Sequence, residues 1–162
     1  MLHLATKLRE VDFSALMHVY EEGNRENGAL VHPELPEGQQ ILRAEQSFYQ
    51  YLQEVFFPTA GAVYAIWVEN DAYISALRLE PYEDGLLLEA LETAPAYRHK
   101  GYAEKLMWAV QAEFPQKIYS HVSKKNTASL ALHQKCGFRQ VLDYAKYIDG
   151  SVVRNAVTLC LR

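Results

Sequence analysis

The stretch TAPAYRHKGYAEKLMWAV, residues 93–110, predicts a helix that begins in an unusual way. From Gly101 onward, apolar residues recur at the i, i+3, i+4, i+7 spacing of one helix face. The turn before this helix contains Arg98, His99 and Lys100, although a helix N-terminus already carries about half a positive charge. No Ser, Thr, Asp or Asn stands there to cap the free N–H groups. One interpretation is a solvated basic turn, and the other is a site where these amides bind an anion.

The composition indicates a single globular domain, residues 1–162, with enough apolar residues for a core. Hydrophobic residues make up 49% and charged residues 22% of the chain, and the net charge is −4. Lys and Arg are dispersed along the sequence, so no nucleic-acid partner is expected. A mildly acidic surface suits a cationic small substrate or a basic peptide tail.

The sequence contains no pattern for targeting, membrane insertion or metal binding. Its first residues, MLHLATKLREVDF, lack the apolar core of a signal peptide, and no apolar run approaches the ~20 residues of a membrane span. Cys136 and Cys160 form no C-x-x-C pair, and the histidines show no metal-ligand spacing. We therefore expect a cytoplasmic protein with free thiols, no metal and no membrane contact.

Hydrophobic periodicity predicts a mixed α/β sheet with flanking helices. Strands are expected at residues 2–8, 62–70, 72–80, 86–93, 117–123, 138–148 and 152–161, and helices at 12–22, 39–57, 101–114 and 126–136. The segment 23–38 is rich in Gly, Pro and Asn and is expected to be a loop. Asp149 and Gly150 mark the turn of a terminal hairpin.

A second motif lies in KKNTASLALHQKCGF, residues 124–138. With the first stretch, it resembles the GNAT superfamily of acetyl-CoA-dependent N-acyltransferases. The phosphate-loop signature of that family, R/Q-x-x-G-x-G/A, is matched by RHKGYA at 98–103, and its V-x-P-x-x-R strand end corresponds to TAPAYR at 93–98. The later signature N-x-x-A/S-x-x-L-Y-x-K-x-G-F begins at Asn126, with His133 in place of the usual Tyr. The resemblance covers essentially the whole chain and implies a mixed, mostly antiparallel sheet flanked by helices.

The resemblance also implies that acetyl-CoA is the co-substrate and indicates where it binds. The amides of the loop, helped by Arg98, would hold the pyrophosphate and so supply the missing cap. The strand that ends at Leu91 and Thr93 would bind the pantetheine arm, and Asn126 would contact or order it. The cofactor-binding residues expected from the family pattern are Leu91, Thr93, Arg98, His99, Lys100, Gly101, Tyr102, Ala103 and Asn126.

N-acetylation needs a base, because a primary ammonium with a pKa of about 10.4 must lose a proton before it attacks the thioester. Several family members carry a catalytic glutamate at the position of Glu89, which makes Glu89 the first choice. Regular alternation would place Glu89 on the face of Leu91 and Thr93, with Glu92 on the opposite face. A bulge in this strand would change that parity. The alternative is that Glu89 is a solvent-facing strand residue.

Two histidines are further catalytic candidates. His121 lies where some protein N-terminal acetyltransferases of the family carry their base, and a histidine pKa near ~6.5 suits that role; a structural histidine is the other interpretation. His133 replaces the Tyr that protonates the departing thiolate in the family. Either imidazolium is this acid, or His133 is a helix-surface residue and water is the acid.

The resemblance implies direct attack on acetyl-CoA in a ternary complex, with the primary amine of a small molecule as the acceptor. Aromatic and acidic residues of the first two helices and the terminal hairpin suit a cationic amine, although aromatic helix faces are also typical of a core. These residues are Tyr20, Glu21, Glu22, Phe48, Tyr49, Tyr51, Tyr144 and Tyr147. The alternatives are a protein or peptide acceptor and a catalytically silent acyl-CoA-binding module. A homodimer would be in keeping with the family.

Overall fold

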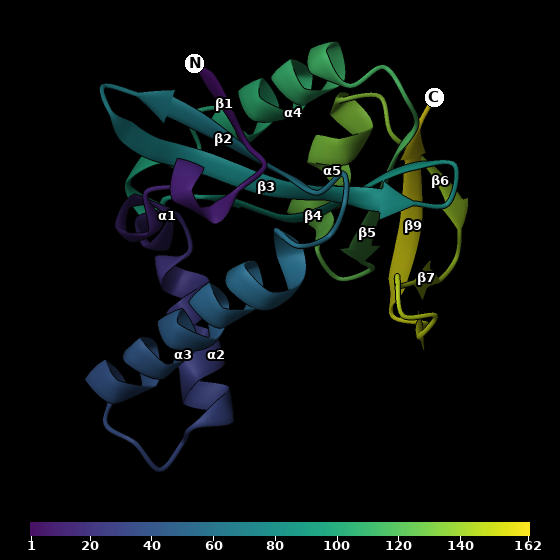
Figure 1. The fold of residues 1–162 in the computed structure, drawn as a ribbon. Coiled ribbons are helices and arrows are strands. Elements are labelled where there is room, and N and C mark those ends of the chain that lie inside the picture. Colours follow the sequence, from purple (N-terminus) through teal and green to yellow (C-terminus); the bar gives the residue numbers. More distant parts are fainter.

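The computed structural model describes residues 1–162 and is built around a seven-stranded sheet in the order β1-β2-β3-β4-β5-β9-β6 (Figure 1). Its strands are β1 (Leu2–Ala5), β2 (Val63–Glu69), β3 (Ala72–Tyr82), β4 (Gly85–Thr93), β5 (Ile118–Ser123), β6 (Arg139–Leu142) and β9 (Ala156–Leu161). Only β4 and β5 pair in parallel; every other pairing is antiparallel. The predicted mixed and mostly antiparallel sheet is therefore confirmed.

The helices lie on both faces of this sheet. They are α1 (Phe13–Val19), α2 (Glu21–Val31), α3 (Glu37–Tyr51), α4 (Tyr102–Glu113) and α5 (Thr127–Lys135), and a π-helical turn, Leu52–Phe56, continues α3. Short 3-10 turns occupy Leu8–Glu10 and Pro95–Tyr97. Asp12 caps α1, with its carboxylate accepting a hydrogen bond from the Ala15 amide at 3.0 Å. No helix combines the length and the apolar character needed to cross a membrane.

The prediction of a loop over 23–38 was wrong, because α2 runs through this segment to Val31. Gly28 is the physical reason. A Cβ at this position would overlap the backbone oxygen of Gln40 on α3. Gly28 therefore allows the backbones of α2 and α3 to approach closely, whereas in the sequence alone such a glycine is typical of a loop. Helices α2 and α3 form a hairpin whose tip projects away from the sheet (Figure 1).

We expect Gly28→Ala to destabilise the protein by about 1–3 kcal/mol, because the added methyl group forces the two helix backbones apart. The free energy of unfolding from urea denaturation measures this effect. Gly23→Ala is the matched control in the same helix, since a Cβ there meets no atom within 4 Å. The control should be neutral or more stable by about 0.5–1 kcal/mol. Equal stability of the two variants would contradict the close packing of α2 on α3.

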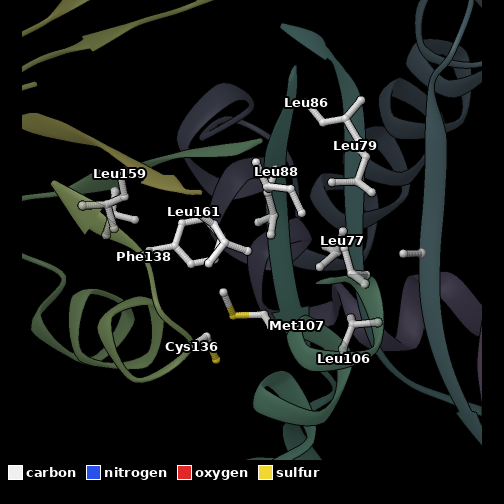
Figure 2. Packing of buried hydrophobic residues seen from close by; sticks show 14 of the residues in the cluster. Leu77, Leu79, Leu86, Leu88, Leu106, Met107, Cys136, Phe138, Leu159 and Leu161 are labelled. Carbon is white, nitrogen blue, oxygen red and sulfur yellow. The ribbon is translucent and has the colours of Figure 1, made fainter. Parts of the chain in front are cut away.

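Two apolar clusters fill the two sides of the sheet. Figure 2 shows the first, in which Leu77 and Leu88 of the central strands meet Met107 of α4. The second cluster joins α1 and the end of α3 to the opposite face, with Leu16 and Phe56 fully buried. Successive side chains of a strand point to opposite faces, and strands β1 to β4 contribute to both clusters. The α1–α3 side and the α4–α5 side are therefore separate environments.

The predicted terminal hairpin is confirmed, but each of its two arms consists of two separate strands. Strands β7 (Ala145–Lys146) and β8 (Val152–Val153) pair on the two sides of the turn at Asp149 and Gly150. Farther from the turn, β6 pairs with β9. Strand β9 also pairs with β5, so the last strand of the chain lies inside the sheet and β6 forms its edge.

Candidate active site

Strands β4 and β5 separate in the middle of the sheet. They pair only where Leu86–Leu88 face Ile118–Ser120. Beyond this point, a cavity of about 200 Å³ lies between the two strands and α5, and its lining includes Glu89, His121 and His133. The structure thus brings the three catalytic candidates of the sequence analysis to one place.

The turn before α4 keeps its amides free. Gly101 is the N-cap residue of α4, with φ at 80°, and no side chain caps this helix. His99 also has a positive φ of 61°. No acceptor in the backbone or side chains of the protein receives a hydrogen bond from the N–H groups of residues 99–104. The first helical hydrogen bond of α4 runs from the Lys105 amide to the Gly101 carbonyl. A Cβ on Gly101 would point into open space. These features fit a bound phosphate group.

A cleft of about 660 Å³ opens in front of these amides. Of the nine residues predicted to bind the cofactor, all except Lys100 line it. The Lys100 ammonium instead donates a hydrogen bond to the Ala96 carbonyl at 3.1 Å and lies 5.6 Å from the centre of the Tyr97 ring. The cleft and the smaller cavity share Leu91, Asn126 and Ser129. An extended ligand can therefore run from the free amides to the opening between β4 and β5.

The Arg98 side chain is held by acidic residues. Its guanidinium pairs with Glu22 at the start of α2 and lies 3.7 Å from a carboxylate oxygen of Glu92. Its Nε donates to the Thr93 carbonyl at 3.2 Å. Burial raises the pKa of Glu92, with Arg98 opposing and Glu22 adding to the rise. The family pattern predicts only that Arg98 binds the pyrophosphate, and it does not show this link between α2 and the end of β4.

Asn126 has a structural role beside its predicted one. It caps α5, with its side-chain oxygen accepting the Ser129 amide at 3.1 Å. The amide nitrogen of the Asn126 side chain is then left to donate to a ligand. Contact between this residue and the pantetheine arm stays a prediction.

A bulge in β4 changes the expected parity of the glutamates. Arg78 of β3 faces Glu89 and Ala76 faces Glu92, so two steps along β3 correspond to three along β4. The extra residue is accommodated around Ala90, which has a φ of 52°. Glu89 and Glu92 therefore lie on the same face of the sheet, towards α1–α3, and the prediction from regular alternation was wrong. Leu91, whose side chain packs in the α4-side cluster, lies on the opposite face.

Glu89 is partly buried, which contradicts the interpretation as a solvent-facing residue. Its Oε2 is buried and has no hydrogen-bond partner. Burial and the neighbouring Glu80 carboxyl raise the pKa of Glu89 to about 8, although Arg78 opposes this rise. A carboxyl group with a pKa near neutrality is suited to accept a proton.

His121 lies on the same face of the sheet as Glu89. Its Nε2 is also buried without a partner, and burial lowers the pKa of its imidazole. The ring packs edge-on against Tyr82 and Tyr147, with centroids 5.6 and 5.0 Å away.

Four buried side-chain atoms of the chain lack a hydrogen-bond partner: Tyr64 Oη, Arg78 Nε, Glu89 Oε2 and His121 Nε2. They form one row across β2, β3, β4 and β5. Tyr64 faces Arg78 and Arg78 faces Glu89, and His121 follows the β5 residue that faces Leu88. Unsatisfied buried polar atoms are rare and costly. Their gathering on the α1–α3 face indicates that this face binds a polar ligand.

Sequence reasoning missed Tyr64 and Arg78 as members of this row. A signal was present, since Arg78 interrupts the otherwise apolar strand segment AYISALRLE.

His133 is a buried residue, which contradicts the alternative of a helix-surface position. Only 2% of it is exposed. Its Nδ1 lies 2.7 Å from the Ser129 carbonyl, which only accepts, so Nδ1 carries the proton. Its Nε2 lies 2.8 Å from the Ser120 hydroxyl and accepts from it. Burial lowers the pKa of His133. The ring is therefore a neutral imidazole with both nitrogens engaged.

Solved structures with the same fold were found across the full chain. A PaiA N-acetyltransferase from Thermoplasma acidophilum in complex with coenzyme A has a TM-score of 0.62 and 13% identity, covering 100% of this chain and 99% of its own. A GNAT family acetyltransferase from Elizabethkingia anophelis with acetyl-CoA bound has a TM-score of 0.63 and 16% identity, covering 100% and 97%. The ribosomal-protein-S18-alanine N-acetyltransferase from Escherichia coli has a TM-score of 0.61 and 18% identity, covering 99% and 93%.

At these identities, the likeness shows the fold. A search of curated protein sequences gave no match. The family model described as acetyltransferase (GNAT) family matches residues 15–138, which is most of the chain and includes the free-amide turn, the bulged strand and the Asn126 cap. The chain therefore belongs to the GNAT acetyltransferase family and is an acyltransferase.

Proposed function

We propose that this protein transfers the acetyl group of acetyl-CoA to the primary amine of a small molecule, by direct attack within a ternary complex. The observation that carries the proposal is the opening between β4 and β5. It contains two buried proton acceptors without partners, those of Glu89 and His121. Through Leu91 and Asn126, it adjoins the cleft with the free amides.

The reaction needs the acceptor nitrogen to lose two protons, one to the base before the attack and one as the amide forms, and it needs one proton to reach the thiolate. The ammonium of the acceptor gives a proton to the base, and the amine nitrogen then bonds to the thioester carbonyl carbon. The bond from this carbon to sulfur breaks, the nitrogen loses its second proton as the amide forms, and the thiolate takes up a proton, so that one proton is released overall. Acetyl-CoA supplies the activated acyl group, while the chain positions the amine, removes its proton and excludes water.

We assign the base to Glu89 rather than His121. A stronger base removes a proton from an ammonium more readily. The pKa of Glu89 is raised to about 8, whereas burial lowers the pKa of His121 from its ordinary value. The ionised Glu89 is therefore the better acceptor of the two. Since His133 is neutral and donates to the Ser129 carbonyl, we assign protonation of the thiolate to water.

The acceptor compartment supports a small substrate. The start of α2 and the end of α3 lie over the face that carries Glu89 (Figure 1). The Tyr20 hydroxyl donates to the Ala90 carbonyl at 2.6 Å, which fixes the junction of α1 and α2 to the bulge. The ion pair of Arg98 with Glu22 holds the same junction from the other side. These contacts hold the α1–α2 junction beside the approach to Glu89, and this favours a small acceptor over a peptide.

A panel of primary amines, peptides with free N-termini and lysine peptides tests the proposal, with release of free CoA thiol as the measurement. We expect turnover with small amines and intersecting lines when both substrates are varied, as a ternary complex requires. Parallel lines would indicate a covalent intermediate instead. Acetylation of peptides alone would contradict the small-molecule acceptor. Tight binding of acetyl-CoA without turnover of any amine would favour the silent module.

A further inference from the structure

The Arg78 guanidinium is a cation without a counter-ion. None of the ion pairs in the chain includes it, and its Nε is buried without a hydrogen-bond partner. Its position is nevertheless fixed, since its central carbon lies 4.8 Å from the centre of the Tyr51 ring and 5.8 Å from that of Phe56. Stacking on aromatic rings holds the planar donor group in one orientation and leaves its N–H groups for another partner.

This guanidinium borders a third cavity, of about 420 Å³, between α2, α3 and the sheet. The polar side chains of the lining are Asn24, Asn27 and Ser47, and the aromatic ones are Phe48 and Tyr51. No carboxylate lines this cavity. An arginine with amide and hydroxyl donors, in a space without acidic groups, is suited to bind an anion.

The nearest acidic residues do not replace such an anion. Glu89 faces Arg78 directly across the strand pair, yet it forms no ion pair with the guanidinium, and its Oε2 has no hydrogen-bond partner. Glu80 is buried on the same face, two residues farther along β3, and it forms no ion pair with Arg78. The unpaired charge of Arg78 is costly unless a ligand of opposite charge reaches it.

We propose that the acceptor is a small amino acid, whose carboxylate binds Arg78 while its amine lies at Glu89. This inference rests on the proposed function, because it names the substrate class of that same site. Directly opposed residues in an antiparallel pair have Cβ atoms about 4.5–5.5 Å apart. The two side chains thus start from neighbouring positions, so that a ligand whose amine and carboxylate are a few bonds apart can reach both groups. A bidentate contact to the arginine fixes the orientation of the ligand, and with it the direction of the amine.

Matched pairs of amines that differ only in charge test this inference: glycine with glycinamide, β-alanine with β-alaninamide, and 4-aminobutyrate with 4-aminobutanamide. In at least one pair, we expect kcat/KM of the wild-type enzyme to be about 10–100-fold higher for the acid, through KM, because a hydrogen-bonded charge pair is lost in the amide. Preference for the amide in every pair, or equal rates, would overturn the inference. This comparison needs no variant and therefore does not depend on how substitutions fold.

Arg78→Gln separates carboxylate binding from a mere effect on Glu89. We expect this variant to lose about 10–100-fold in kcat/KM with the acid and less than about threefold with the amide. Arg78→Lys should recover part of the loss, since the charge returns without the fork of donors. An equal loss with acid and amide would mean that Arg78 acts only on Glu89, and would overturn the inference. Arg43→Gln removes the same charge from an exposed position of α3 and is the control.

The outcomes for the inference and for the proposed function are distinct. If no amine reacts while acetyl-CoA still binds, the proposed function fails, and this inference fails with it. If amines and diamines without a carboxylate react well and amino acids do not, the proposed function stands and only the carboxylate site at Arg78 is wrong.

Discussion

We expect Gly101→Glu to abolish the binding of acetyl-CoA and CoA while the protein stays folded. Gly101 lies at the start of α4 with a φ of 80°, and a side chain there points into the open space before the free amides. A carboxylate in that space both fills the phosphate position and repels the phosphates. We expect affinity to fall by about 100-fold or more, because several charge-assisted hydrogen bonds are lost together. Calorimetric titration with CoA and acetyl-CoA measures the change.

Gly150→Glu is the matched control for this variant. Gly150 has a φ of 85° and no atom within 4 Å of an added Cβ, but it lies in the turn between β7 and β8. The control therefore carries the same backbone strain, about 1–2 kcal/mol, without a side chain in the cleft. It should bind CoA as the wild type does. Unchanged affinity in the Gly101 variant would refute the assignment of the free amides to the pyrophosphate.

Replacing Glu89 by glutamine should lower kcat by about 10²–10⁴-fold, the range for loss of a general base, with the affinity for CoA unchanged. In the wild type, kcat/KM should rise with pH up to about 8, because Glu89 becomes a base only as it loses its proton. The glutamine variant should lack this rise. Exposed Glu113 on α4 provides a matched control, since Glu113→Gln makes the same chemical change outside the site.

Stability provides a second measurement on the same variant. Since burial raises the pKa of Glu89 to about 8, the folded state binds this proton more tightly than the unfolded chain does. The corresponding stability is fully present below pH ~4.3, where the unfolded chain is also protonated, and is lost as pH rises through 8. Glutamine resembles the protonated acid and does not ionise. The free energy of unfolding of the variant should therefore exceed that of the wild type by an amount that grows between pH 5 and pH 8.

The base assignment fails if His121→Ala, and not Glu89→Gln, removes the rate and its pH dependence. Both residues line the same cavity with an unpartnered atom. Both residues are therefore candidates for the base, and only the comparison of the two variants separates their roles.

Much of the fold was predictable because it depends on local patterns. The alternation in β2 to β4 and the helical spacing after Gly101 are periodicities of the kind that decide secondary structure. The uncapped start of α4 was also readable, since a cap is formed by residues next to it in sequence. Helix α2 was missed because the reason for Gly28 lies on another helix, at Gln40. Local composition does not reveal such a tertiary contact.

The same distinction applies to the site. The free amides and the position of Asn126 follow from contiguous motifs. The face of the sheet on which Glu89 lies does not follow from these motifs, because the bulge near Ala90 shifts β4 by one residue against β3. Arg78 was missed because its importance depends on what it faces across the strands and on the absence of any partner. The burial of His133 depends on how α5 packs on β5, which no spacing in the motif shows.

The contact of Arg98 with Glu22 has a consequence for how the two substrates bind. An anion in the cleft competes with Glu22 and Glu92 for one guanidinium, and Glu22 belongs to the helix that borders the acceptor compartment. Competition of this kind is a coupling free energy, and by thermodynamic linkage each substrate alters the affinity of the other by the same factor. Affinities for the acceptor are therefore defined only at a stated concentration of acetyl-CoA.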